Sequence, residues 1–221
     1  QSAMWQAMLM SAGLPPSKQI LIHGFITVDG QKMSKSVGNV IAPKALVEKY
    51  GIDPVRYYLL REIPSGEDGD FSYEKFEARY NGDLANGLGN LVARVARLEE
   101  KISPIKFQEE DIRFAVDMTR GRRTIYEKQI QTFHLNEALS TIWELISLTD
   151  KYIADDRPWT IKDDPDLFRQ VIVKACYFIH AITVLIEPFL PETAEKIKEQ
   201  IAVRDSEIII KKMGNLFPRL L

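Results

Sequence analysis

The strongest helical signal in the chain lies at residues 83–102, DLANGLGNLVARVARLEEKI. Its apolar residues recur at steps of four and three, which places them on one stripe of an amphipathic helix. This stripe consists of Leu84, Leu88, Leu91, Val95, Leu98 and Ile102. Because a helix with one apolar stripe must bury it against other elements, the segment predicts a helical core that begins near residue 83.

The rest of the chain after this segment carries the same periodicity. It predicts long helices from Asp111 to Phe133, from Leu135 to Ile153 and from Leu167 to Ile186. Together with residues 83–102, these helices are expected to pack as a bundle. A shorter helix from Glu192 to about Ile201 and a tail from residue 208 to the end complete this part.

Before residue 80, strand-like and helix-like signals alternate. The run from Ile20 to Val28 is rich in β-branched and aromatic residues, and it predicts a strand covered on both faces. Asp29 and Gly30 follow it and predict a tight turn, because both residue types tolerate a positive φ. A hairpin or loop should therefore project the next residues outward.

Three short helices are expected in the remainder of this first part. One begins at Pro43 and stops at Gly51, and the next begins at Asp53-Pro54 with Asp53 as its N-cap. Ser72 is expected to cap a third helix, after an acidic loop. The expected fold class is mostly α, with alternating strands and helices and a linking region at residues 1–80 and an α-helical bundle at residues 81–221. We place the domain boundary near Tyr80.

Composition excludes several classes of protein. The 221 residues are 45% hydrophobic and 27% charged, and 29 Lys and Arg against 31 Asp and Glu leave a formal charge of −2. Binding to nucleic acid or to an acidic membrane must therefore be local rather than driven by the whole chain. A single cysteine, Cys176, excludes an internal disulfide and fits a cytoplasmic protein. The longest apolar stretch, Tyr177 to Ile186, has about half the length of a bilayer span, so no membrane span is expected.

A polar, basic run follows the predicted turn: Lys32-Met33-Ser34-Lys35-Ser36. Lysine ammonium groups, hydroxyls and free backbone N–H groups are suited to the non-bridging oxygens of a polyphosphate. By charge composition alone, a solvated surface loop is the commoner case. The spacing therefore indicates a phosphate loop without establishing one.

The residues from Gly24 to Asn39, GFITVDGQKMSKSVGN, closely resemble the signature-loop region of class I aminoacyl-tRNA synthetases. The stretches Arg61 to Pro64, Asp68 to Ser72 and Asn81 to Arg94 are similar to methionyl-tRNA synthetases of the bacterial type. The resemblance continues through Arg157-Pro158-Trp159 and covers most of the chain. It implies a Rossmann-type catalytic domain, of which residues 1–80 are the C-terminal remnant, followed by an α-helical anticodon-binding bundle.

What the resemblance implies is ATP- and Mg²⁺-dependent activation of methionine and its transfer to tRNA(Met). Lys32 and Lys35 would be catalytic, and Lys32, Met33, Ser34, Lys35 and Ser36 would bind ATP. The family's His-Ile-Gly-His motif, its inserted zinc-binding segment and most of its methionine pocket have no counterpart in these residues. We therefore expect a fragment of a longer protein that is not catalytically competent alone.

A second candidate site follows the helix at residues 83–102. Asn86, Asn90 and Arg94 are spaced by four residues and form a ladder offset from the apolar stripe. Trp159 follows Arg157-Pro158 at a helix end, where an indole can stack on a base. By pattern alone, a solvated face and a tryptophan lid on the core are commoner. The resemblance implies instead that Asn86, Asn90, Arg94 and Trp159 bind the CAU anticodon.

Other candidates carry less chemistry. His134 and His180 have no second ligand at metal-binding spacing, so no metal site is predicted in this chain. Asp155-Asp156 and Asp163-Asp164 flank turns, where aspartate caps helices. Three alternatives remain open: a non-catalytic tRNA-binding module, a helical domain with an inert loop, and a sister synthetase for leucine, isoleucine, valine or cysteine. The oligomeric state is open too.

Overall fold

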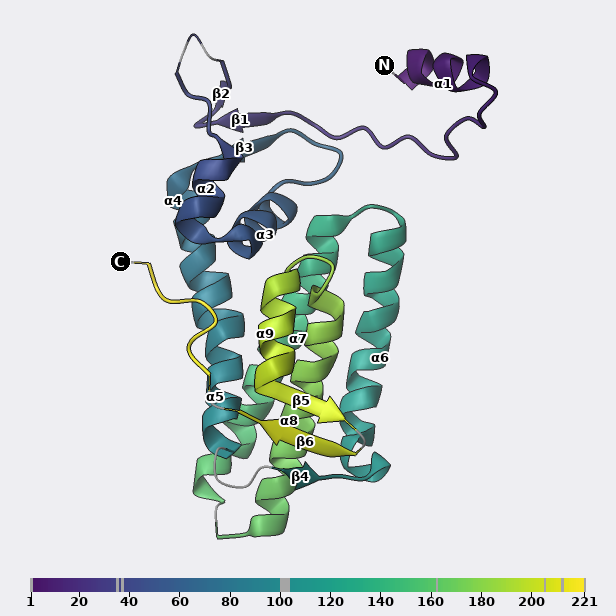
Figure 1. Ribbon diagram of the computed structural model, residues 1–221. Helices are drawn as coiled ribbons and strands as arrows, with labels where there is room; N and C mark the ends of the chain where they lie inside the picture. Colours follow the sequence, from purple (N-terminus) through teal and green to yellow (C-terminus); the bar gives the residue numbers. More distant parts are fainter. Residues whose placement is uncertain are drawn as a thin grey trace.

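The computed structural model describes residues 2–34, 36, 38–99, 104–161, 163–204, 206–211 and 213–220. Two predicted features fall outside these residues, namely the side chain of Lys35 and the end of the apolar stripe at Ile102. The fold class is mostly α, as predicted. The elongated molecule has the β1–β2 hairpin at one end and the turn between α7 and α8 at the other (Figure 1).

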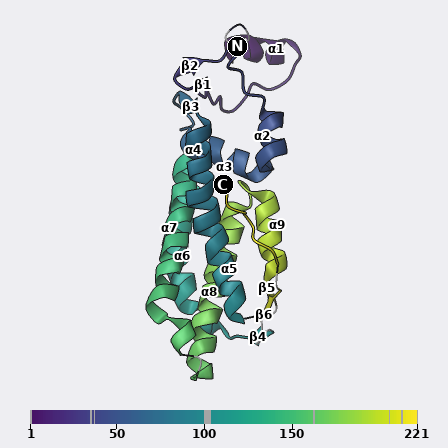
Figure 2. The same ribbon diagram turned by 90° about the vertical axis from the view of Figure 1, so that its left-hand side faces the viewer.

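The predicted bundle is confirmed. Its helices run alternately down and up, and the turned view shows them side by side (Figures 1 and 2). Leu84, Leu88, Leu91 and Val95 are each 0% exposed, so the predicted stripe is the core face. The bundle elements are α4 (Tyr73–Arg79), η1 (Tyr80–Gly89), α5 (Asn90–Glu99), α6 (Glu109–Gln131), α7 (Leu135–Asp156) and α8 (Pro165–Ile186).

Residues 80–89 form a π-helix rather than the regular α-helix that the periodicity predicts. Glycine relieves a close approach at the end of this segment, because a Cβ at Gly89 would lie only 3.0 Å from the Leu84 carbonyl oxygen. A Cβ at Gly87 would lie 3.6 Å from Nε1 of Trp143, which is an ordinary contact. The offset between Asn86 and Asn90 therefore follows π geometry, and only Asn90 and Arg94 are one α-helical turn apart. The boundary that we place at Tyr80 stays a prediction, and a continuous helical run crosses it.

Helix α8 is the central helix of the bundle. Within the described residues it alone is long and apolar enough to cross a membrane, but 61% of its apolar window is buried inside the protein. Asp164 caps it by accepting a hydrogen bond from the Leu167 N–H at 3.1 Å, as expected for the paired acids near this turn. Burial of this kind is what a core helix of a globular bundle shows.

The predicted strand over residues 20–28 is wrong for most of its length. Only Ile26–Val28 (β1) pairs, antiparallel with Gln31–Lys32 (β2) and parallel with Gly69–Phe71 (β3). Ile22 and Phe25 are 75% and 76% exposed, because no described element covers them. The turn between β1 and β2 is confirmed: Asp29 and Gly30 have φ of 50° and 73°. The preceding helix, α1 (Ser2–Ser11), has no buried residue.

Helices α2 (Pro43–Tyr50) and α3 (Ile52–Glu62) connect the hairpin to the bundle. The predicted role of Asp53 as the N-cap of α3 is wrong. Its carboxylate is 3% exposed and accepts a hydrogen bond at 2.6 Å from the N–H of Thr193, in the first turn of α9 (Pro191–Gln200). Arg56 of α3 also donates to the carbonyls of Pro188 and Phe189, both at 2.8 Å. These contacts attach the linking region to the bundle.

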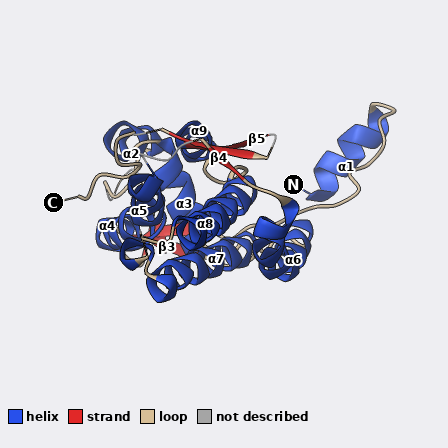
Figure 3. Ribbon diagram, turned by 90° about the horizontal axis from the view of Figure 1, so that it is seen from below, coloured by secondary structure: helices blue, strands red, loops and turns tan. Residues whose placement is uncertain are grey.

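A small sheet was not predicted. Ile105–Lys106 (β4), Ile201–Arg204 (β5) and Glu207–Ile210 (β6) pair in the order β4-β6-β5, all antiparallel. Figure 3, seen along the bundle, shows this sheet at the periphery beside α9. Its pairing joins residues about 100 positions apart, as Ile105 pairs with Ile208, and no local pattern encodes such a contact.

Candidate functional site

The predicted phosphate loop begins where β2 ends at the exposed Lys32. Asn39 closes the loop from its far side: its Oδ1 accepts from the Ser34 N–H at 2.9 Å, and its Nδ2 donates to the Lys32 carbonyl at 3.2 Å. The Gly38 N–H donates to the Ser34 carbonyl at 3.1 Å. The role of Asn39 was missed, although an amide beside a serine and glycine run is a recognisable turn signal.

Side chains along the loop differ in exposure. Ser36 is exposed and its hydroxyl lies 2.7 Å from that of the half-buried Ser34. Met33 packs against the hydrophobic core, so its side chain anchors the loop rather than reaching solvent. The described loop therefore offers one ammonium group, at Lys32, and two adjacent hydroxyls to a ligand. Lys35 lies outside the described residues.

The acidic loop at residues 67–70 holds the hairpin in place. Asp70 Oδ1 accepts from the Gly30 N–H and from the Thr27 hydroxyl, both at 2.7 Å. These hydrogen bonds, first that of Gly30 and then that of Thr27, lower the pKa of Asp70 below its usual value. Asp68 accepts from the Phe25 N–H at 2.7 Å. The sequence suggested only a linker here, but these carboxylates orient the turn that presents the loop.

The three residues of the predicted ladder on the bundle differ in their exposure and in their hydrogen-bond partners. Asn90 is exposed at the start of α5. Asn86 is exposed too, but its Oδ1 accepts from Nε and Nη2 of Arg219 at 2.9 and 2.6 Å, which leaves the amide N–H groups to face outward. Arg94 is half-buried and donates to Asp150 of α7 at 2.7 Å. The partners Arg219 and Asp150 were not predicted, because both are distant in sequence.

The Arg94–Asp150 pair is partly desolvated, with side chains 32% and 31% exposed. Burial raises the pKa of Asp150 above its ordinary value, and the neighbouring guanidinium offsets this only in part. One edge of the Arg94 guanidinium is held by the carboxylate, while its other N–H groups remain available as donors. The pair therefore orients Arg94 on the face between α5 and α7.

Trp159 lies at the tip of the bundle, on the single-turn helix η2 (Pro158–Thr160). Helix α7 ends at Asp156 and is capped by Arg157, whose φ of 43° and ψ of 59° are left-handed. Pro158 is buried, whereas the indole of Trp159 is 47% exposed. This tryptophan is therefore not a lid on the core, and half of its ring is free to stack on a ligand. The phosphate loop lies at the opposite end of the molecule (Figure 1).

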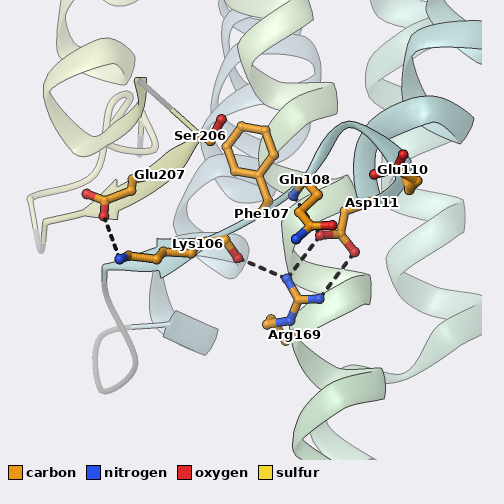
Figure 4. A pocket seen from close by; sticks show the side chains of 8 residues that line it. All are labelled: Lys106, Phe107, Gln108, Glu110, Asp111, Arg169, Ser206 and Glu207. Carbon is orange, nitrogen blue, oxygen red and sulfur yellow. Dashed lines mark hydrogen bonds and ion pairs between the residues drawn. The ribbon is translucent and has the colours of Figure 1, made fainter.

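A pocket between β4 and the start of α6 is braced by Arg169 (Figure 4). Its Nη1 and Nη2 donate to Asp111 at 3.1 and 3.2 Å, and Nη1 also donates to the Lys106 carbonyl at 2.9 Å. Burial acts to raise the pKa of Asp111, but the Gln108 N–H and Arg169 outweigh it and lower the pKa. In this pocket Arg169 pairs with Asp111, and Lys106 pairs with Glu207. We therefore assign the pocket a structural role, in which it attaches the small sheet to the bundle.

The parts of the chain that the structure describes contain no candidate metal-binding site. No three His, Cys, Asp or Glu side chains there are grouped to hold an ion. His180 is half-buried, and burial, with Lys198 nearby, lowers its pKa. The absence of a metal site in the whole chain stays a prediction.

Comparison with known families matches both halves of the molecule. Residues 1–96 match the model of class I tRNA synthetases (M), and residues 105–218 match the anticodon binding domain of methionyl tRNA ligase. The methionine–tRNA ligases of Clostridium acetobutylicum and Bacillus subtilis are 42% and 39% identical over 90% and 92% of this chain. The matched regions make up 32% of each of those ligases, so the chain spans about a third of their length.

The fold also matches solved structures. Mycobacterium tuberculosis methionyl-tRNA synthetase in complex with methionyl-adenylate superposes with a TM-score of 0.85 and 32% identity, over 98% of this chain and 47% of that one. The free form of the same enzyme gives a TM-score of 0.81. The exposed loop after β2 and the helix bundle thus occur together in this chain as they do in those proteins, and the chain belongs to the methionyl-tRNA ligase family of class I synthetases.

Proposed function

We propose that this chain is the part of a methionine–tRNA ligase that supplies the phosphate loop and anticodon recognition. The reaction is the ATP-dependent activation of methionine, with Mg²⁺, followed by transfer of methionine to tRNA(Met). The observation that carries the proposal is the joint presence of a loop closed by Asn39 and, on the bundle, of two exposed amides, the half-buried Arg94 guanidinium and the half-exposed Trp159. Family membership supports the same reading. The place of action is the cytoplasm.

At the loop, the proposal assigns ATP binding to Lys32, Met33, Ser34, Lys35 and Ser36. When methionine attacks the α-phosphate, negative charge builds up on the departing pyrophosphate. Lysine ammonium groups at positions 32 and 35 stabilise that charge, and the hydroxyls of Ser34 and Ser36 hold non-bridging oxygens. The loop chemistry fits a polyphosphate, because Lys32 and Ser36 are exposed. Mg²⁺ supplies charge neutralisation on the phosphates when bound.

At the face, the proposal assigns the CAU anticodon to Asn86, Asn90, Arg94 and Trp159. Bases splayed out of a loop expose their Watson–Crick edges, which amides and a guanidinium read by hydrogen bonds. Trp159 offers its half-exposed indole as a stacking platform, an interaction worth about 1–3 kcal/mol per base. Residues 81–221 hold 20 Lys and Arg against 22 Asp and Glu, so base contacts rather than bulk charge must provide the preference.

The test is the binding of the chain to two anticodon hairpins, one with CAU and one with that triplet changed, by fluorescence anisotropy at a stated salt concentration. We expect the CAU hairpin to bind at least about tenfold more tightly, a difference of roughly 1.4 kcal/mol. Trp159→Ala should abolish the preference. Tyr73→Ala is the matched control, because Tyr73 is 48% exposed at the start of α4, away from the face. Equal binding of both hairpins contradicts base recognition.

A non-catalytic tRNA-binding module is the second candidate. One observation favours it: the longer of the two matched regions, residues 105–218, corresponds to the anticodon binding domain of methionyl tRNA ligase. Methionine-dependent pyrophosphate exchange by the chain alone separates the two. Activity would identify a competent enzyme, whereas hairpin binding without activity would identify a binding module that needs the remainder of a ligase.

A further inference from the structure

A second cationic site lies along α7, outside the phosphate loop and the anticodon face. It is a cavity of about 610 Å³, here called the α7 groove. Side chains from α3, α6 and α7 meet in it. The residues that line it are Arg61, Arg122, Ser140, Trp143, Glu144, Ser147, Leu148 and Lys151.

The groove follows one face of a single helix. Ser140, Ser147 and Lys151 are seven and then four residues apart on α7, which puts them on the same side of that helix. The 11 steps from Ser140 to Lys151 extend over about 16 Å at 1.5 Å per residue. Arg61 at the end of α3 and Arg122 on α6 add their guanidinium groups from the flanks.

Buried donors in the groove lack partners. Nε of Arg61 and Nε of Arg122 are both shielded from solvent, and neither has a hydrogen-bond partner among the described residues. The Arg122 Nε lies 3.8 Å from Glu144, too far for a hydrogen bond, and Arg122 Nη1 makes only a long contact of 3.5 Å with the Met118 carbonyl. Because an unsatisfied charged donor costs free energy, such groups point to an anionic ligand.

Charge in the groove is strongly local. The lining residues carry three cationic side chains against one carboxylate, that of Glu144, in a chain whose formal charge is −2. Two serine hydroxyls, at positions 140 and 147, accompany the guanidinium forks. Arginine guanidinium groups and side-chain hydroxyls commonly bind phosphate oxygens in nucleic-acid complexes.

The groove leads to the anticodon face. Trp143, which lines the groove, and Asp150, the partner of Arg94, are seven residues apart on α7 and therefore share one side of that helix. Trp143 also lies beside the η1 segment that carries Asn86, because its Nε1 is 3.6 Å from the place that a Cβ on Gly87 would take. An RNA strand whose bases contact Asn90 and Arg94 would therefore pass close to the cationic side chains of the α7 groove.

We infer that the α7 groove binds the sugar–phosphate backbone of the RNA whose anticodon meets Asn90, Arg94 and Trp159. Arg61, Arg122 and Lys151 neutralise phosphates, and Ser147 donates a hydrogen bond to them, whereas the Ser140 hydroxyl already donates to the Asn136 carbonyl at 2.9 Å. The identity of the RNA rests on the proposed function, whereas the phosphate chemistry rests on the groove. Such contacts hold the stem in register without reading its sequence.

The experiment uses the whole chain and the two hairpins described above, titrated between about 0.05 and 0.2 M salt. The variant is Arg122→Gln combined with Lys151→Gln. It should weaken the binding of both hairpins by the same factor, on the order of tenfold or more at about 0.1 M salt, and lower the slope of log K against log salt by roughly 1.4–1.8. Glu144→Gln removes the one acid that lines the groove and should tighten the binding of both hairpins.

Two controls separate charge at the groove from general effects. Arg123→Gln makes the same change one residue along α6, where the guanidinium pairs with Glu127 at 2.8 Å, and should leave affinity and slope unchanged. Arg122→Lys keeps the charge and should retain most of the affinity. Thermal unfolding of each variant verifies that it is folded.

An unchanged affinity and salt slope in the double variant overturns the inference, and so does a loss confined to the CAU hairpin, which would make the groove part of base recognition. Failure of any hairpin to bind the unmodified chain also overturns it. Equal binding of the two hairpins to the unmodified chain contradicts the proposed anticodon recognition instead, while a parallel loss in the double variant would still support the groove as a phosphate site.

Discussion

The proposed phosphate loop and the proposed anticodon face, formed by Asn86, Asn90, Arg94 and Trp159, are built on different principles. The loop itself is closed by partners close in the sequence, since Ser34, Gly38 and Asn39 bond one another within six residues, and only the hairpin that presents it depends on the distant Asp68 and Asp70. The anticodon face is held by partners far away, because Arg94 needs Asp150 and Asn86 needs Arg219, 56 and 133 residues on. Local bonds make the loop recognisable as a motif, whereas the face exists only when the bundle is folded.

This contrast predicts that a cavity in the bundle core weakens binding at the anticodon face but leaves the loop unchanged. Leu88 lies in η1 and is 0% exposed, so Leu88→Ala should lower the free energy of unfolding by about 3 kcal/mol through the cavity it leaves. CAU binding should weaken with it. Denaturant unfolding measures the first effect and anisotropy the second. Lys32→Ala, at an exposed site, is the control and should leave stability unchanged. A stable Leu88→Ala chain would refute the dependence of the face on this core.

At the loop, the expected effect is on chemistry alone. Lys35→Ala in a complete ligase should slow methionine-dependent pyrophosphate exchange by roughly 10²-fold, mainly in kcat, because a charge that stabilises the leaving pyrophosphate is lost. The affinity for the CAU hairpin should not change. Lys44→Ala, on the exposed face of α2, serves as the matched control. An unchanged kcat would remove Lys35 from the proposed machinery.

The Arg94–Asp150 pair allows stability and recognition to be separated. Burial, partly offset by Arg94, raises the pKa of Asp150, so the neutral form is favoured by folding. Its stabilising contribution is complete below the pKa of an unfolded aspartate and is lost as the pH rises through the higher pKa in the folded chain. Asp150→Asn should therefore not reduce the free energy of unfolding at pH 7 by more than about 1 kcal/mol.

Recognition should respond differently to the same substitution. Without a carboxylate to orient Arg94, CAU binding should weaken about tenfold, on the order of 1.4 kcal/mol. In the unmodified chain, affinity should fall on acidification at a higher pH than an ordinary aspartate would give, while the Asp150→Asn chain should lack that component. The control for Asp150→Asn is Glu137→Gln, at the start of α7. Glu144 is not suitable as a control position, because it lines the α7 groove. Identical pH profiles would exclude Asp150 as the orienting group.

The smallest expected effect lies in the turn that presents the loop. Gly30 has a φ of 73°, and a Cβ there would be in open space, so Gly30→Ala meets only backbone strain of about 1 kcal/mol. Hydrogen exchange of the paired residues Thr27 and Lys32 should accelerate several-fold, while the bundle amides stay protected. Gly66→Ala, which has open space and no positive φ, should leave the exchange unchanged. Equal exchange in both variants would show that the turn tolerates the strain.

Much of the fold could be predicted where the signal is local and periodic. The apolar stripe from Leu84 to Val95 is buried as expected, and Ser72 caps α4 through the Lys75 N–H at 3.2 Å. The predictions were wrong where one local sequence pattern is compatible with two different structures. The run from Ile20 to Phe25 has strand composition but forms no strand, and Asp53 has the sequence of an N-cap but binds α9 instead. Packing, which a single segment does not encode, decides such cases.

By itself, the sequence determined the helical class, the order of the bundle helices and the Asp29-Gly30 turn, because periodicity and turn chemistry act over a few positions. The residues of both candidate sites stay predictions that rest on the family resemblance. Only the tertiary structure decided the π-helical offset of Asn86, the pairing of Arg94 with Asp150, the small sheet and the α7 groove. The ion pair, the sheet and the groove require groups that are distant in the chain to be brought together, and the free energy that does so comes from burial of the shared core rather than from any one segment.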